Sequence, residues 1–255
     1  MKLLALARDL KRRKARERHG LFVAEGVRTV EVLLESTLQV RGTLVSRDAV
    51  DDPRTARLIN RCETRRIPVE LVDDREFASA ADTESPQGIL SLAGIPLSPP
   101  ESLPASGTVL VLDAVQDPGN AGTIIRSAAA LGVSVTIALP GTVDLWNAKV
   151  VRSAMGALFT HCVTSLTWEE TVAWLDRQHI PLWVADTAGE PLHVAVKTRP
   201  TRVALVVANE GAGVSPHVAA ACARTVAIPM MAGTESLNVA VAAGILLYVL
   251  ETGAP

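Results

Sequence analysis

The stretch DPGNAGTIIRSAAALGV (residues 117–133) follows the apolar run TVLVLD (108–113), and together they predict a strand, a turn and a helix. Asn120 ends the turn and is a suitable N-cap for a helix that begins at Ala121. The turn lacks the glycine spacing of dinucleotide-binding loops. The helix carries one arginine, Arg126, which taken alone is most simply a surface residue in an ordinary ion pair.

The same pattern of strand and helix continues through the rest of the C-terminal part. Apolar runs, typical of parallel strands buried on both faces, occupy residues 108–114, 133–139, 181–186, 202–210 and 225–230. Helices are expected at about 120–132, 147–158, 168–178 and 215–222, and the last is the apolar segment 236–251. A doubly wound sheet binds its ligand at the carboxyl ends of its strands. The loops with polar residues and glycine fall there, at 113–123, 208–215 and 229–238.

The second of these loops is ANEGAGVS (208–215). A tight strand-to-helix turn capped by Ser215 explains most of it. Glu210 is less easily explained, because a carboxylate at the mouth of a buried strand needs a partner. Arg126 is the nearest candidate by topology.

The third loop opens the segment IPMMAGTESLNVAVAAG (228–244) and places Ser236 and Asn238 at the first turn of an apolar helix. A simple N-cap of a buried helix is an equally good interpretation. The apolar residues IPMM suit the lining of a site for an adenine or a thioether.

The N-terminal part predicts a small α/β sandwich. Helices are expected at 3–18, 27–36 and 53–66, and strands at 21–26, 40–46, 67–72 and 88–95. A proline-rich segment, IPLSPPESLPASG (95–107), follows and is typical of a linker. We therefore predict two domains, at 1–97 and 108–255, with a linker at 98–107.

Composition narrows the class of protein. Hydrophobic residues make up 48% and charged residues 20% of the 255, as in a globular protein, and no apolar run reaches membrane-span length. The three cysteines are scattered, which predicts neither a disulfide framework nor a zinc site and favours the cytoplasm. Net charge is −2, yet residues 8–20 (RDLKRRKARERHG) carry seven basic and two acidic side chains. Such a run is usually a solvated helix face; it also suits RNA phosphates.

Taken in order, DPGNAGTIIRSAAALG, NEGAGVS and IPMMAGTESLNVAVAAGILLYVL resemble the three signature motifs of the SpoU (TrmH-type) RNA 2′-O-ribose methyltransferases of the SPOUT superfamily. RRKARERHGLFVAEGVRTVEVLL and SPQGIL are similar to the L30-like RNA-binding domain of the rRNA-modifying branch. The resemblance implies an α/β fold whose parallel-sheet domain ends in a deep trefoil knot, with S-adenosylmethionine as cofactor and a homodimer built on the final helix. One departure is Ala208, where the family usually has glycine.

The resemblance also implies roles for individual residues. It places catalysis on the set Asn120, Arg126, Glu210, Ser236 and Asn238. It places the cofactor against the set Ala208, Asn209, Gly211, Ile228, Met230 and Leu237. We expect RNA phosphates to contact the basic residues Arg8, Lys11, Arg12, Arg13, Lys14, Arg16, Arg18, Arg28 and Arg152. Arg152 is equally well an ordinary helix-surface residue, and no metal site is expected.

The predicted reaction is methyl transfer to a ribose 2′-hydroxyl, with ribosomal RNA favoured over transfer RNA as the substrate. Because an arginine rarely loses its proton, we expect Arg126 to hold the neighbouring phosphate and stabilise the developing alkoxide instead of acting as a base. A non-catalytic RNA-binding or ribosome-assembly factor on the same fold is one alternative. A nucleotide-dependent dehydrogenase is another, although the chain lacks the glycine fingerprint and the acidic residue of that class.

Overall fold

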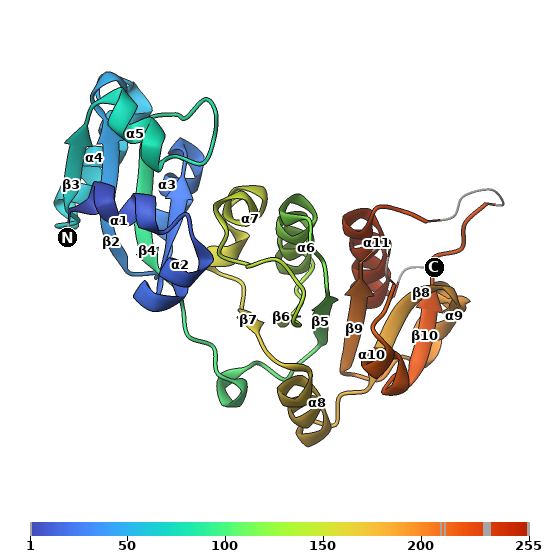
Figure 1. The fold of residues 1–255 in the computed structure, drawn as a ribbon. Coiled ribbons are helices and arrows are strands. Elements are labelled where there is room, and N and C mark those ends of the chain that lie inside the picture. Colours follow the sequence, from blue (N-terminus) through green and yellow to red (C-terminus); the bar gives the residue numbers. More distant parts are fainter. Residues whose placement is uncertain (1, 210, 212, 232–235, 254–255) are drawn as a thin grey trace. The chain divides into compact units, whose positions relative to one another are not determined.

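The computed structural model describes residues 2–209, 211, 213–231 and 236–253. The chain forms two compact units, each with its own sheet (Figure 1). The first unit comprises residues 1–96 and 144–160, and the second comprises residues 97–143 and 161–255. The change of unit after residue 96 falls beside the predicted linker. The return of residues 144–160 to the first unit has no counterpart in the sequence pattern.

The first unit is built on a four-stranded mixed sheet in the order β1-β4-β2-β3. β4 runs antiparallel to β1 and β2, whereas β2 and β3 are parallel. The strands are β1 (Leu21–Glu25), β2 (Val40–Ser46), β3 (Val69–Val72) and β4 (Ile89–Gly94). Alternate strand residues face opposite sides: Leu44, Leu90 and Leu92 join one buried cluster, and Val45 and Ile89 join the other.

Helices cover both faces of this sheet, which is the α/β sandwich that the sequence predicts. α1 (Leu3–Asp9) and α5 (Asp74–Ala80) belong to the first cluster, and α3 (Val27–Glu35) and α4 (Pro53–Thr64) to the second. The short helix α5 is not predicted from the sequence, although Asp73 and Glu76 form a capping box at its start. A 3₁₀ turn, η1 (Arg47–Ala49), follows β2.

The expected basic helix at 3–18 is divided into α1 and α2 (Arg13–His19). The buried guanidinium of Arg16 donates from Nη1 to the carbonyl oxygens of Leu10 (2.7 Å) and Lys11 (2.9 Å). A continuous helix needs these carbonyls for its own i to i+4 hydrogen bonds. The hydrogen bonds of Arg16 to these two carbonyls therefore account for the break.

Residues 144–160 complete the core of the first unit. They contain α7 (Ala148–Ser153) and the 3₁₀ turn η3 (Ala157–Phe159), and α7 contacts β1. The ring of Phe22 lies 4.6 Å from that of Trp146 and 5.7 Å from that of Phe159, centroid to centroid. Because few aromatic residues exist in this chain, this cluster is a large part of the aromatic packing of the unit.

The second unit is built on a six-stranded sheet in the order β10-β8-β9-β5-β6-β7, and all its pairs are parallel. Its strands are β5 (Thr108–Asp113), β6 (Val135–Ala138), β7 (Val163–Ser165), β8 (Leu182–Pro191), β9 (Val203–Ala208) and β10 (Arg224–Ala227). In β5, Val109 and Val111 join a cluster with α8 (Trp168–Arg177) and α10 (Pro216–Ala220). Leu110 and Leu112 are equally buried and face the other side.

On that other side lie α6 (Pro118–Ala130) and α11 (Val239–Thr252), which contact each other, and α11 also contacts β9. A Cβ added to Gly244 of α11 would lie 4.0 Å from Ser127 Oγ of α6, so small residues let the two helices approach closely. The remaining short elements are η2 (Pro100–Ser102), α9 (Leu192–Ala195) and η4 (Val196–Thr198). Parallel strands bring the starts of α6 and α11 and the loop after β9 to one edge of the sheet (Figure 1).

Candidate functional site

The first loop differs from the sequence prediction in its cap. α6 begins at Pro118, and Asp117 is the N-cap, with its carboxylate accepting from the Asn120 amide at 2.7 Å. Asn120 was expected to cap a helix starting at Ala121; this is wrong, because proline is preorganised for the first helical position and an aspartate precedes it. The Asn120 side chain is consequently not used as a cap.

Asn120 instead joins the first loop to the third. Its Oδ1 accepts a hydrogen bond from Nδ2 of Asn238 at 3.0 Å. Asn238 is the N-cap of α11, and its Oδ1 accepts from the amides of Ala240 (3.0 Å) and Val241 (3.3 Å). One amide group therefore caps a helix and bridges two loops. Ser236, which the sequence places in the first helical turn, precedes the cap and is exposed.

The second loop is held by the end of β5. The buried carboxylate of Asp113 accepts from the amide of Ser215 at 2.7 Å, and its carbonyl accepts from the amide of Asn209 at 3.2 Å. The next residue, Ala114, adopts a left-handed φ of 54°, and its carbonyl accepts from Asn209 Nδ2 at 3.3 Å. Both ends of the 209–215 loop are thus attached to two residues that the sequence analysis did not select.

The predicted cofactor residues of this loop form a compact turn. Asn209 Oδ1 accepts from the amide of Gly211 at 2.8 Å, and its carbonyl accepts from the amide of Gly213 at 2.9 Å. Ala208 has a negative φ, so alanine in place of the family's glycine adds no backbone strain there. Glu210 lies outside the described residues.

A cavity of about 110 Å³ opens beside the third loop. Three of the six predicted cofactor residues, Ile228, Met230 and Leu237, line it, together with the predicted catalytic residue Ser236. The other lining residues are Ala185, Asp186, Thr187, Val226, Ala227, Ala242 and Leu246. The walls are mainly apolar, with Asp186 and Thr187 as polar groups that the sequence analysis missed. Their only sequence signal is a position just past a buried apolar run.

Arg126 lies on α6 and is exposed. It forms no hydrogen bond or ion pair with any residue that the structure describes, and it is not among those that line the cavity. Its predicted partner, Glu210, is not described. Its guanidinium is therefore available to a bound anion as far as the described residues are concerned.

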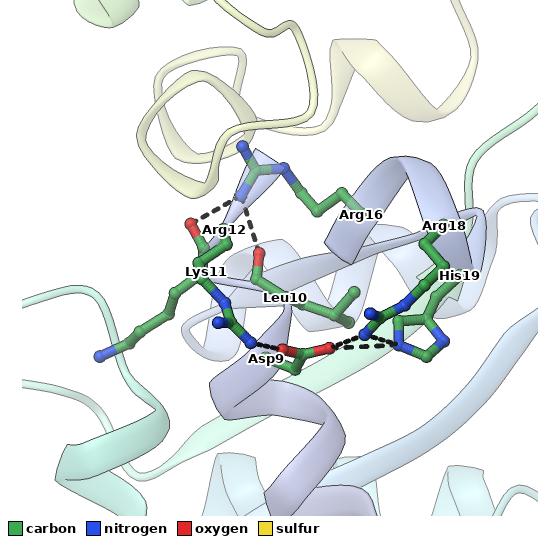
Figure 2. A network of polar contacts seen from close by, with 7 residues as sticks. All are labelled: Asp9, Leu10, Lys11, Arg12, Arg16, Arg18 and His19. Atoms are coloured by element: carbon green, nitrogen blue, oxygen red, sulfur yellow. Dashed lines mark hydrogen bonds and ion pairs between the residues drawn. The ribbon is translucent and has the colours of Figure 1, made fainter. Parts of the chain in front are cut away.

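Most of the predicted RNA contacts lie in α1, α2 and the turn between them, and many are engaged in local ion pairs. Asp9 accepts from Arg12, from Arg18 (2.6 Å) and from His19 (3.2 Å) (Figure 2). The hydrogen bond from Arg12 is the main reason that the pKa of Asp9 lies below its usual value. Arg13 pairs with Glu17 (2.8 Å), and Arg28 pairs with Glu31 (2.7 Å).

The arginines of these pairs are nonetheless exposed, as are Lys11, Lys14 and Arg8, whose Nε donates to Ser79 Oγ at 2.7 Å. The N-terminal segment is therefore a cationic surface whose arginines are partly neutralised by their neighbours. A pair of exposed charges contributes little to stability, so these arginines could exchange partners at small cost.

Two residues of the predicted RNA set are already paired with carboxylates of the first unit. Arg16 is 5% exposed, and besides its bonds to main-chain carbonyls its Nε lies 2.8 Å from Asp144 Oδ2. Arg152 pairs through Nη2 with Asp82 (2.9 Å) and through Nη1 with the buried Glu25 (3.4 Å). Both neutralise carboxylates within the first unit, and removing them to bind phosphate would leave buried charge unpaired.

No group of three or more histidine, cysteine, aspartate or glutamate side chains is arranged to hold a metal within the part of the chain that the structure describes. In that same part, no helix is long and apolar enough to cross a membrane.

Comparison with known proteins gives two family matches. Residues 107–248 match the SpoU rRNA methylase family, and residues 5–91 match the MRM3-like substrate binding domain. The 23S rRNA (guanosine(2553)-2′-O)-methyltransferase RlmP of Bacillus subtilis is 34% identical, over 96% of this chain and 94% of the relative. The 23S rRNA (guanosine-2′-O-)-methyltransferase RlmB of Escherichia coli K12 is 30% identical, over 88% and 95% respectively.

A solved structure has the same fold over nearly the whole chain. The SpoU methyltransferase AviRb from Streptomyces viridochromogenes, in complex with the cofactor AdoMet, superimposes with a TM-score of 0.87 at 26% identity, covering 97% of this chain and 96% of that one. The chain belongs to the SpoU rRNA methylase family. The predicted class, an S-adenosylmethionine-dependent RNA 2′-O-methyltransferase on an α/β fold with a parallel sheet, is confirmed.

Proposed function

We propose that this chain transfers a methyl group to a ribose 2′-hydroxyl of 23S rRNA where its three loops meet, at the carboxyl edge of the parallel sheet. The observation that carries this placement is the hydrogen bond between Asn120 and Asn238. It joins the first and third predicted motifs, and the cavity lined by Ile228, Met230 and Leu237 lies beside the third. The 23S rRNA methyltransferases named above support the choice of RNA.

The cavity suits part of S-adenosylmethionine. Its apolar walls fit an adenine ring or a thioether, and Asp186 accepts hydrogen bonds from ribose hydroxyls in our proposal. At about 110 Å³ it is smaller than the roughly 300 Å³ of a full small-molecule site. We therefore assign the rest of the cofactor to the 208–211 main chain. When bound, the cofactor supplies an electrophilic methyl group on a sulfonium.

Arg126 is proposed to act on the RNA and not on the cofactor. With the cofactor bound, the 2′-oxygen would form a bond to the methyl carbon as the carbon–sulfur bond breaks, the bonding electron pair would stay on the sulfur, and the hydroxyl proton would pass to solvent water. Arg126 holds the phosphate next to that ribose and stabilises the negative charge that develops on the oxygen. Asn120 and Asn238 fix the geometry of the two loops, and Ser236 and Glu210 are proposed to complete the catalytic set.

Replacing Arg126 tests this assignment. In Arg126→Ala we expect methyl transfer to unmodified rRNA to fall by about a thousandfold, while the Kd for S-adenosylmethionine changes by no more than about threefold. Arg126→Lys keeps the charge but loses the planar fork, so we expect partial activity. Calorimetry and radiolabel transfer give the two values, and a large loss of cofactor affinity would contradict the assignment.

The remaining features are proposed on the family resemblance. We propose residues 1–97 as an L30-like substrate-binding domain and 108–255 as a knotted catalytic domain, from which residues 144–160 return to the first unit. A homodimer is supported by exposed Val241, Ile245 and Tyr248, which form one apolar stripe on α11. In analytical ultracentrifugation, a wild type that sediments as a dimer and a Val241→Asp/Tyr248→Asp double variant that sediments as a monomer would support this interface. Cytoplasmic action follows from an rRNA substrate.

A further inference from the structure

Helix α4 presents a row of arginines that the sequence analysis did not select. Arg57, Arg61 and Arg65 recur every fourth residue, and Arg65 is the C-cap. Together with Asn60 and Thr64 they line a surface hollow of about 390 Å³. We call these five residues the α4 arginine face.

The orientation of this face is fixed by the core of the first unit. Thr55, Leu58 and Cys62 are the buried residues of α4, and the last two belong to the cluster on that side of the sheet. Asp52 caps the helix through the amides of Arg54 and Thr55. With a rise of about 1.5 Å per residue, the three arginines stand about 6 Å apart along a rigid helix.

The charges of these three arginines are less compensated by neighbouring carboxylates than those of the arginines around Asp9. Arg57 forms no hydrogen bond or ion pair with any described residue. Arg65 donates to the main-chain carbonyl of Leu34, which leaves its charge uncompensated. Arg61 has one long, exposed contact, 3.5 Å from Nη1 to Glu35 Oε1, which is worth little.

We propose that the α4 arginine face binds the sugar-phosphate backbone of the RNA substrate, as a second contact surface besides the N-terminal segment. A row of planar guanidinium groups matches successive phosphates, and Asn60 and Thr64 add neutral donors that suit phosphate or 2′-hydroxyl oxygens. No aromatic side chain belongs to the face, so it does not stack on bases. The match of residues 5–91 to a substrate-binding domain agrees with this. The proposal rests on the proposed function for its choice of RNA.

Charge-neutral variants of the full chain test the proposal. The triple variant Arg57→Gln/Arg61→Gln/Arg65→Gln removes three charges while keeping good helix formers. The matched control, Arg41→Gln/Arg47→Gln/Arg75→Gln, removes three exposed charges that lie on separate elements of the same unit. Binding of a fluorescent polyuridine oligonucleotide is measured across a range of salt concentrations, and methyl transfer is measured on unmodified rRNA transcript.

We expect the α4 variant to bind the oligonucleotide roughly tenfold more weakly and to lose about 2 units from the slope of log K against log salt. Its KM for rRNA should rise with kcat and the S-adenosylmethionine Kd unchanged, and the control should resemble the wild type. Equal salt slopes and KM values in the two triple variants would overturn the proposal. Failure of the wild type to methylate any rRNA, with its salt-dependent binding intact, would instead overturn the proposed function.

Discussion

At the scale of single residues, Asp113 connects the sheet to the second loop. It is 3% exposed, and its carboxylate accepts a hydrogen bond from the amide of Ser215. Removing the carboxylate leaves that amide without this partner. We expect Asp113→Ala to lower the free energy of unfolding by about 2 kcal/mol and to weaken S-adenosylmethionine binding by tenfold or more. Urea denaturation and calorimetry measure the two effects.

The conservative variant Asp113→Asn separates positioning from folding, because its amide oxygen still accepts the hydrogen bond. It should recover most of the cofactor affinity. Asp176→Asn, at an exposed position of α8, serves as the control. If Asp113→Ala bound the cofactor as well as the wild type, the loop would not depend on this carboxylate.

His161 makes stability depend on pH. Burial lowers its pKa from 6.5 to about 4, and its Nε2 lies 2.8 Å from Thr136 Oγ1. Between these two values the unfolded chain binds a proton that the folded chain does not. The contribution of the neutral His161 side chain to the free energy of unfolding is therefore fully present above about pH 6.5 and is lost as the pH falls toward 4.

The expected loss over that interval is about 3 kcal/mol. His161→Gln should flatten this part of the stability curve, whereas His193→Gln, at an exposed position, should not. Denaturant midpoints at a series of pH values are the measurement. Parallel curves for wild type and His161→Gln would show that the imidazole is not the group responsible.

Sequence reasoning at this scale selected Asn120 and Asn238 as candidate site residues but missed the hydrogen bond between them and the contacts of Asp113 and Arg16. A polar residue after an apolar strand is visible in a sequence, whereas its burial is not. The partner of Arg16 is 128 residues away, and no local pattern reveals such a pair.

At the scale of elements, β8 and β10 approach each other so closely at Gly189 that no side chain fits between them. A Cβ on Gly189 would lie 2.6 Å from the backbone of Val226, where the pairing shifts register. We expect Gly189→Ala to push β10 away from β8 and to lower the free energy of unfolding by about 2 kcal/mol. Because Val226 and Ala227 line the cavity, cofactor affinity should fall as well.

Gly94→Ala is the matched control, since its Cβ would lie 3.8 Å from the carbonyl oxygen of Gln39, an ordinary van der Waals contact. Thermal unfolding of the two variants compares them directly. Equal melting temperatures would show that β10 adjusts without cost.

Most elements were predictable because apolar periodicity determines which segments are buried. All strands except β7 fall close to their expected places, and so do helices α3, α4, α6, α8 and α11. The short elements α5, β7 and α9 were missed, since segments this short carry too few residues to show a period.

At the scale of the whole molecule, the first unit depends on residues 144–160. Asp144→Ala leaves the buried charge of Arg16 unpaired, and we expect it to destabilise this unit by about 3 kcal/mol. Hydrogen exchange of the amides in β1 and β4 reports on this unit alone.

The exposed pair of Arg13 and Glu17 offers the comparison. We expect Glu17→Ala to lower the free energy of unfolding by less than about 1 kcal/mol. The double variant Arg16→Met/Asp144→Leu should recover most of the lost stability, because it removes both charges together. Unchanged exchange in Asp144→Ala would mean that the pair does not stabilise the unit.

The chain passes between its two units three times, after residues 96, 143 and 160. A single recombination point near residue 97 would therefore give a hybrid whose Phe22 and Arg16 face a foreign Trp146 and Asp144. Exchanging the proposed substrate-binding unit among relatives requires transplanting two separate segments at once. Residues 1–96 and 144–160 should accordingly diverge together, as one inherited module, even though more than forty residues of a different unit separate them.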